Sequence, residues 1–154
     1  MTPPTAYNYA LSLLAARPYA TRALHRKLIQ KQYLAADADD AIRRLVANGL
    51  LDDVRYAEQY ARSKMLSTGA SKRRLQQDLY RKGIKPDVAA QAIANVIDQD
   101  EVDTSATVER VAKKKLALLG DLEPFVLRRR LFAFLARRGY DVDEIKAVVG
   151  RLVS

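Results

Sequence analysis

The segment that decides the fold is "KRRLQQDLYRKGIKPDVAAQAIANV", residues 72 to 96. Leu75 and Leu79 lie one helical turn apart, and Gly83 interrupts the pattern before a second apolar set begins at Ala89. Apolar residues three and four apart share one face of a helix, and glycine is typical just past a helix end. The segment therefore predicts two amphipathic helices joined by a short turn.

Two other segments repeat this pattern without a gap. They are "TRALHRKLIQKQYLAADADDAIRRL" (21 to 45) and "RRRLFAFLARRGYDVDEIKAVVGRL" (128 to 152). The first two leucines of each segment occupy the same columns, which are Leu24, Leu75 and Leu131, then Leu28, Leu79 and Leu135. The break falls at Gln32 in the first segment and at glycine in the other two. Repetition of this kind predicts copies of one structural unit.

A further helical pattern precedes each repeat, at about residues 5 to 16, 53 to 68 and 103 to 119. The alternating runs and glycine-rich hairpins typical of strands are not found. The sequence thus predicts an all-α protein of three tandem three-helix repeats, spanning 1–51, 52–101 and 102–154. Because one such unit buries too little alone, we expect neighbours to pack in sequence and form an elongated, curved body.

The stretch "GLLDDVRYAEQYARSK" (49 to 64) places two carboxylates side by side, which raises the question of a reaction centre. Gly49 is the residue expected just past a helix end, and Asp52 is a preferred N-cap for the next helix. Asp53 would then meet the positive end of the helix dipole, with Leu51 and Tyr56 forming a hydrophobic staple. We interpret the stretch as a junction between helices.

Side chains that carry chemistry are scarce. The only histidine, His25, has no cysteine or second histidine for metal spacing, and the chain has no cysteine at all. The "DADD" stretch at 37 to 40 fails as a calcium loop, because Ile42 and Asn48 stand where glycine and glutamate are required. No phosphate-binding glycine loop is present. We therefore predict a protein that is not an enzyme, with no catalytic residue, no metal and no cofactor.

The charge balance is more informative, because 27 Lys and Arg against 18 Asp and Glu give a net charge of +9. An excess of that size indicates an anionic partner. One column of arginines is predicted near the start of each second helix, where a cation opposes the helix dipole: Arg22, Arg73 and Arg129. A second set follows one helix face in the later repeats: Arg74, Arg81, Arg130 and Arg137.

We take these seven arginines as the candidate binding site for a partner. The alternative, a basic face that is merely solvated, stays open for any single residue. Lys31, Lys82 and Arg138 lie at predicted helix C-termini, where a cation is favourable, and we interpret them mainly as structural. The lack of cysteines and of long apolar segments favours a cytoplasmic protein with no membrane partner. We expect a monomer.

Four stretches of the chain resemble the RecX family of regulatory proteins. "GLLDDVRYAEQYARSK" is similar to its Gly-Leu-Ile-Asp-Asp-x-Arg-Phe-Ala signature, and residues 10 to 28, 75 to 84 and 134 to 149 are similar to further family blocks. The resemblance implies a protein that binds the RecA filament on single- or double-stranded DNA. It also implies inhibition of the ATPase, strand-exchange and co-protease activities of RecA. The alternative is a stand-alone DNA-binding module without specific RecA regulation.

Overall fold

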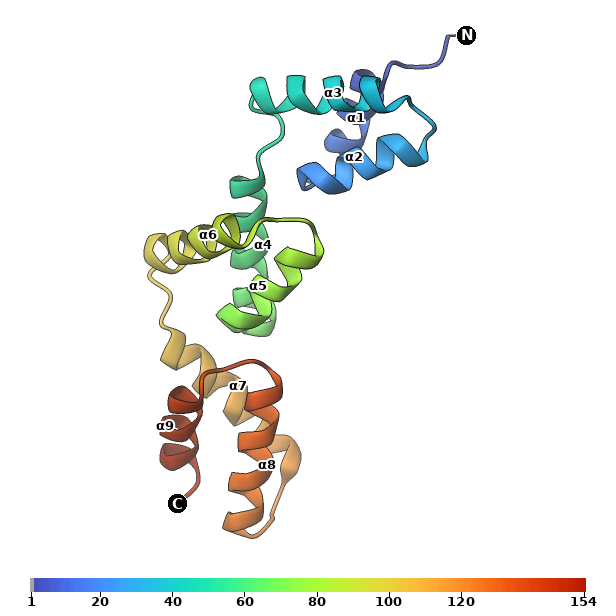
Figure 1. Ribbon diagram of the computed structural model, residues 1–154. Helices are drawn as coiled ribbons and strands as arrows, with labels where there is room; N and C mark the ends of the chain where they lie inside the picture. The colour runs from blue at the N-terminus through green and yellow to red at the C-terminus, as the bar shows by residue number, and fades with distance from the viewer. Residues whose placement is uncertain (1) are drawn as a thin grey trace.

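The computed structural model describes residues 2–154, which form nine α-helices and no strand. The helices are grouped in threes along an elongated, curved body, with the two ends of the chain at opposite ends of it (Figure 1). The predicted all-α fold of three tandem three-helix units is confirmed. None of the described helices has the length and hydropathy needed to cross a membrane.

Each unit contains three helices that follow one another directly in the sequence. The first unit contains α1 (Ala6–Ala16), α2 (Thr21–Gln30) and α3 (Ala35–Ala47). The second unit contains α4 (Asp53–Thr68), α5 (Lys72–Arg81) and α6 (Pro86–Gln99). The third unit contains α7 (Thr104–Leu119), α8 (Pro124–Arg137) and α9 (Val142–Leu152). Within every unit the third helix packs against both the first and the second. The third helix therefore holds its unit together.

The hydrophobic core is divided into three clusters, one for each unit. The repeated leucine columns of the sequence are fully buried in them, at 0% exposure: Leu24, Leu28, Leu75, Leu79, Leu131 and Leu135. Each such leucine contributes on the order of 2 kcal/mol of burial free energy. Ala20 of the first unit is buried in the cluster of the second, so burial also joins these units.

The segments that link the units stay close to the unit before them. Leu51 belongs to the first core, and Val102 packs against the second. The predicted staple between Leu51 and Tyr56 is wrong, since Tyr56 lies against the second core instead. The cause is a backbone turn in which the Leu51 N–H donates to the Leu45 carbonyl, 3.2 Å away, and draws Leu51 back. The division into 1–51, 52–101 and 102–154 stays a prediction.

The turn after each second helix has a left-handed backbone. The φ angles are 78° at Gln32, 86° at Gly83 and 90° at Gly139. A Cβ on Gly83 would lie 2.8 Å from the Cβ of Arg22 in the preceding unit, and one on Gly139 would lie 2.7 Å from the Oγ of Ser71. Gln32, at the equivalent turn of the first unit, has an exposed side chain.

The paired aspartates divide two capping tasks between them. Asp52 is the N-cap of α4 and accepts from the N–H groups of Val54 and Arg55 at 3.0 and 3.2 Å. Gly49, with φ of 72°, follows the end of α3. The predicted junction between helices is thus confirmed, and local capping accounts for Asp52.

Asp53 caps a helix of the neighbouring unit. Its Oδ1 accepts from the backbone N–H of Thr21, the first residue of α2, at 2.7 Å. The residue before Thr21 is Ala20, which has no side chain able to cap α2. The first N–H groups of a helix lack partners within the helix, so Asp53 supplies from the second unit what the first unit lacks.

The junction between the second and third units uses different groups for the same purpose. Ser71 caps its own helix α5 by accepting from the Arg74 N–H at 3.1 Å, and its hydroxyl donates to the Arg138 carbonyl at 2.9 Å. The Tyr140 hydroxyl donates to the Gly69 carbonyl just past the end of α4. This junction is therefore closed by two hydroxyl donors together with the Arg138 guanidinium, which donates to the Thr68 carbonyl.

We predict that Asp53→Ala lowers the free energy of unfolding by about 1 kcal/mol more than Asp37→Ala, because it also removes the cap of α2. Asp37 is the matched control, since both residues lie in the first turn of their own helices and lose the same dipole interaction. The measurement is urea denaturation followed by circular dichroism. Equal losses for the two variants would contradict the capping role.

Candidate functional site

The seven arginines of the predicted site all lie on the outside of the body. Every one is exposed, and they belong to the second helices α2, α5 and α8: Arg22, Arg73, Arg74, Arg81, Arg129, Arg130 and Arg137. Across residues 2–154, five of them form no ion pair, which are Arg22, Arg73, Arg129, Arg130 and Arg137. Their positive charge therefore faces solvent, and their role as a binding site stays a prediction.

Arg129 does not lie near a helix start, although the repeat pattern predicts that it should. Helix α8 begins at Pro124, because proline is favoured at the first helical position, and this adds a turn before the repeat. The argument from an unfavourable helix dipole holds only for Arg22 and Arg73. The guanidinium of Arg129 instead lies 5.8 Å from the centroid of the Phe125 ring.

Arg74 and Arg81 are held by one carboxylate. Asp78 lies 3.5 Å from the Nε of Arg74 and 3.4 Å from the Nη1 of Arg81, on the same face of α5. The Asp78 side chain is only 18% exposed, whereas those of Arg74 and Arg81 are 53% and 70% exposed. The carboxylate thus holds one nitrogen of each guanidinium group and leaves the rest of both groups exposed to a ligand.

A basic hollow of about 340 Å³ lies between the first and second units. It is bounded mainly by α2 and by the C-terminal end of α5. The cations that line it are Arg17, Arg26, Lys27, Arg81 and Lys82. Among the described residues, no acidic one lines this hollow, so its potential is positive.

A second basic hollow, of about 630 Å³, adjoins it between α4, α5 and the third unit. Its cations are Lys64, Arg74, Arg81, Lys82 and Arg138, and Asp78 is the acid among its lining residues. The two hollows share Arg81 and Lys82, so they flank the same end of α5. Together they place eight different cations around one acid, which suits a chain of negative groups.

Sequence reasoning missed several residues of these hollows. The repeat pattern does not identify Arg26 and Lys27, and it indicates a mainly structural role for Lys82 and Arg138. Arg26 follows Arg22 by one helical turn, and that spacing is a signal that could have identified it. Arg138 has both roles, since its guanidinium also donates to the Thr68 carbonyl at the end of α4.

Tyr60 lies in the second hollow beneath two ammonium groups. The Nζ of Lys82 is 5.2 Å from the ring centroid and that of Lys64 is 5.8 Å away, within cation-π range. The Tyr60 hydroxyl donates to Asp78 at 3.2 Å. Burial, followed by the charge of Asp78 and this hydrogen bond, raises the pKa of Tyr60 above its usual value. Tyr60 is therefore a neutral donor that orients Asp78.

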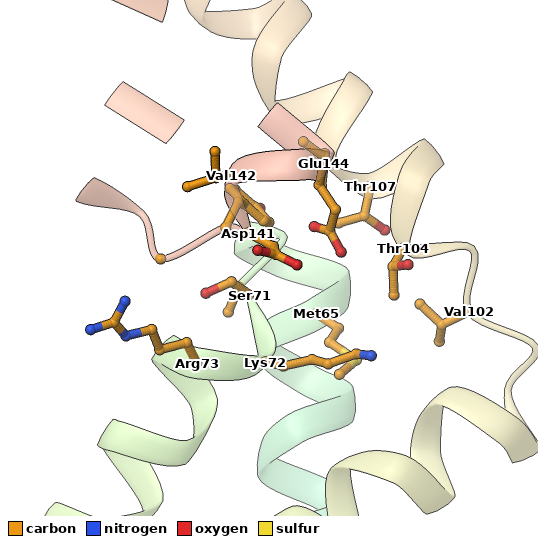
Figure 2. A pocket seen from close by; sticks show the side chains of 14 residues that line it. Met65, Ser71, Lys72, Arg73, Val102, Thr104, Thr107, Asp141, Val142 and Glu144 are labelled. Atoms are coloured by element: carbon orange, nitrogen blue, oxygen red, sulfur yellow. The ribbon is translucent and has the colours of Figure 1, made fainter. Parts of the chain in front are cut away.

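A third cavity, of about 370 Å³, lies where the second unit meets the third (Figure 2). Lys72 and Arg73 line one side of it, and Asp141 and Glu144 line the other. Met65 adds an apolar wall from α4. Because its charges are mixed in sign, this cavity does not extend the basic surface.

Groups suited to metal binding or catalysis do not gather in the described part of the chain. Within residues 2–154, no three His, Cys, Asp or Glu side chains are placed to hold a metal ion. The Nε2 of His25 lies 2.7 Å from the Oδ1 of Asp39. This pair connects α2 to α3 and contributes to the packing of the first unit.

We predict that Asp78→Asn lowers the pKa of Tyr60, because the variant removes the negative charge that disfavours the phenolate. The value stays above that of a free tyrosine, about 10, because the burial remains. The measurement is a pH titration of ¹³C-labelled tyrosine by NMR, with Tyr60→Phe to assign the signal. An unchanged or raised pKa in the variant would contradict the coupling.

The raised pKa of Tyr60 also makes the free energy of unfolding depend on pH in the alkaline range. The pKa of Tyr60 is higher in the folded state than in the unfolded state. Its contribution to the free energy of unfolding is therefore complete below its pKa in the unfolded state. That contribution is lost as the pH rises through its pKa in the folded state. Burial raises the pKa of Tyr140 in the same direction. The free energy of unfolding should therefore fall above about pH 10, and less steeply in Tyr60→Phe.

Models of one protein family match all three units of the chain. The first three-helix domain of RecX matches residues 6–45, the second matches 52–93, and the third matches 101–149. These matches fall on the three groups of helices seen in the structure.

Curated relatives are similar along nearly the whole chain. The regulatory protein RecX of Trichlorobacter lovleyi is 34% identical over 145 residues, covering 94% of this chain and 93% of the relative. That of Actinobacillus pleuropneumoniae serotype 5b is 35% identical over 143 residues, covering 93% and 89%. The crystal structure of RecX from Lactobacillus salivarius has the same fold, with a TM-score of 0.85, 21% identity, and coverage of 96% of this chain and 94% of that one.

Proposed function

Because this chain belongs to the RecX family of regulatory proteins, we propose that it binds the RecA-DNA filament and inhibits RecA. The activities it lowers are the ATPase, strand-exchange and co-protease activities. It works in the cytoplasm, as a monomer, by docking and without bond chemistry. The observation that carries the proposal is the pair of adjoining hollows, where eight cations surround one acid on an elongated body.

The shape and the charge of the body support a filament as the partner. Duplex DNA carries a negative charge about every 1.7 Å along its axis, so a filament on DNA offers a long row of phosphates. An elongated protein with cations on successive units can touch several of these phosphates and neighbouring protein subunits together (Figure 1). Arginine suits this task, because its planar guanidinium binds phosphate through two parallel hydrogen bonds.

The proposed mechanism is differential binding. A ligand shifts an equilibrium only as far as it binds one state more tightly than another. The protein therefore inhibits RecA by binding more tightly to a filament state that is inactive or prone to disassemble. Exposed cations of the two basic hollows and of α5 and α8 supply the attraction, and Asp78 keeps Arg74 and Arg81 in place.

The deciding experiment titrates the protein into the DNA-dependent ATPase reaction of RecA at amounts well below one protein per RecA subunit. Inhibition far below saturation of the DNA supports filament regulation. Inhibition only when the protein covers the DNA would overturn it and indicate a stand-alone DNA-binding module. An excess of bare competitor DNA separates the two outcomes further, because it removes only the second kind of inhibition.

We predict that replacing four exposed arginines of α5 and α8 by alanine weakens inhibition and flattens its dependence on salt. The four are Arg73, Arg74, Arg129 and Arg130. The slope of log affinity against log salt should become shallower by about one for each phosphate that the variant no longer binds. Helix content, measured by circular dichroism, should not change.

The control removes the same net charge from elsewhere on the surface. Its four substitutions to alanine affect exposed cations outside α5, α8 and both basic hollows: Arg43, Lys85, Lys146 and Arg151. If net charge alone matters, both variants lose the same potency. If the arginines of α5 and α8 bind the partner directly, only the first variant does. Equal potency of the first variant and the unmodified protein would reject the site.

A further inference from the structure

At each junction between units, one glycine of the later unit lies close against the unit before it. Gly83 follows α5 and lies under the first turn of α2, and Gly139 follows α8 and lies under the first turn of α5. The two glycines hold the same place in the repeat, and both have the left-handed backbone. The contact between successive units therefore recurs at equivalent positions.

At Gly83 the contact involves atoms that cannot move aside. A Cβ on Gly83 would lie 2.6 Å from the Cδ of Arg22 and 2.8 Å from its Cβ. Rotation of the side chain can remove the Cδ, but the Cβ of Arg22 is fixed by the backbone of α2. Carbon atoms in contact lie about 3.5 to 4.0 Å apart, so a methyl group at position 83 must displace α2 by about 1 Å.

At Gly139 the nearest group is a hydroxyl. A Cβ there would lie 2.7 Å from the Oγ of Ser71, which already caps α5 and donates to the Arg138 carbonyl. Moving the hydroxyl breaks both hydrogen bonds. The nearest backbone atom, the N of Arg74, is 3.7 Å away, an ordinary contact. The second contact is thus less rigid than the first.

We propose that Gly83 and Arg22 together set the angle between the first and second units. Arg22 is then a positioning residue, which acts through its methylene stem and the shape of the body. This differs from the direct binding role that its charge suggests. The inference concerns the free protein and does not depend on the identity of its partner.

The chain provides a matched control for the cost of a side chain in left-handed backbone. Gly49 has φ of 72°, close to the 86° of Gly83, and a Cβ at Gly49 would meet nothing within 4 Å. Gly49→Ala and Gly83→Ala therefore share the backbone strain. Only Gly83→Ala also brings a methyl group into collision with α2.

The experiment measures the distance between spin labels on the first two units. Because the chain has no cysteine, labels attach only at introduced ones, here Ala36→Cys on α3 and Ala90→Cys on α6, both exposed. Double electron-electron resonance should show a shifted mean distance in Gly83→Ala and none in Gly49→Ala. The double variant Arg22→Gly with Gly83→Ala should return the distance to its original value, because it removes the side-chain atoms that the new methyl group would meet.

Two outcomes would overturn the proposal. One is the same distance distribution in Gly83→Ala and Gly49→Ala. The other is a shift in Gly83→Ala that Arg22→Gly does not reverse. Arg22→Met separates stem from charge, since it keeps the methylene groups and should leave the distance unchanged.

The link to RecA rests on the proposed function and has its own measurement. Gly83→Ala should inhibit the RecA ATPase less well than Gly49→Ala. A shifted label distance with unchanged inhibition would keep the positioning role and remove its link to RecA.

Discussion

The structure depends on the need of helix ends for hydrogen-bond partners. A helix leaves its first N–H groups and last carbonyl groups without partners of its own. Here those partners come from the adjoining unit: Asp53 completes the start of α2, while Tyr140 and Arg138 complete the end of α4. Three small cores that bury little between them are joined in this way into one body with a defined shape.

The same joints place the charges that the proposed function uses. One basic hollow lies beside the first joint and the other beside the second, and both include the end of α5. Their cations come from different units, so the spacing between positive groups is set by how the units meet. Arg138 makes the connection plain, because one guanidinium both closes a joint and lines a hollow. Shape and charge in this protein are therefore not separate properties.

Local and periodic features could be predicted from the sequence. Leucine columns identified the cores, and Asp52 was recognised as a cap because capping needs only neighbouring residues. The second role of Asp53 could not be found, since its partner Thr21 lies in another unit. The early start of α8 was missed because the repeat outweighed the signal of Pro124. The hollows gather cations from separate helices, which no pattern along the chain reveals.

Gln32 has a left-handed backbone and an exposed side chain, at the place where the two later repeats have glycine. Left-handed backbone favours glycine but does not exclude other residues, so conformation alone does not decide which residue stands at this turn. At Gly83 and Gly139 atoms of an adjoining unit lie within 3 Å of where a Cβ would be. Packing between units therefore makes glycine necessary only at turns that contact another unit.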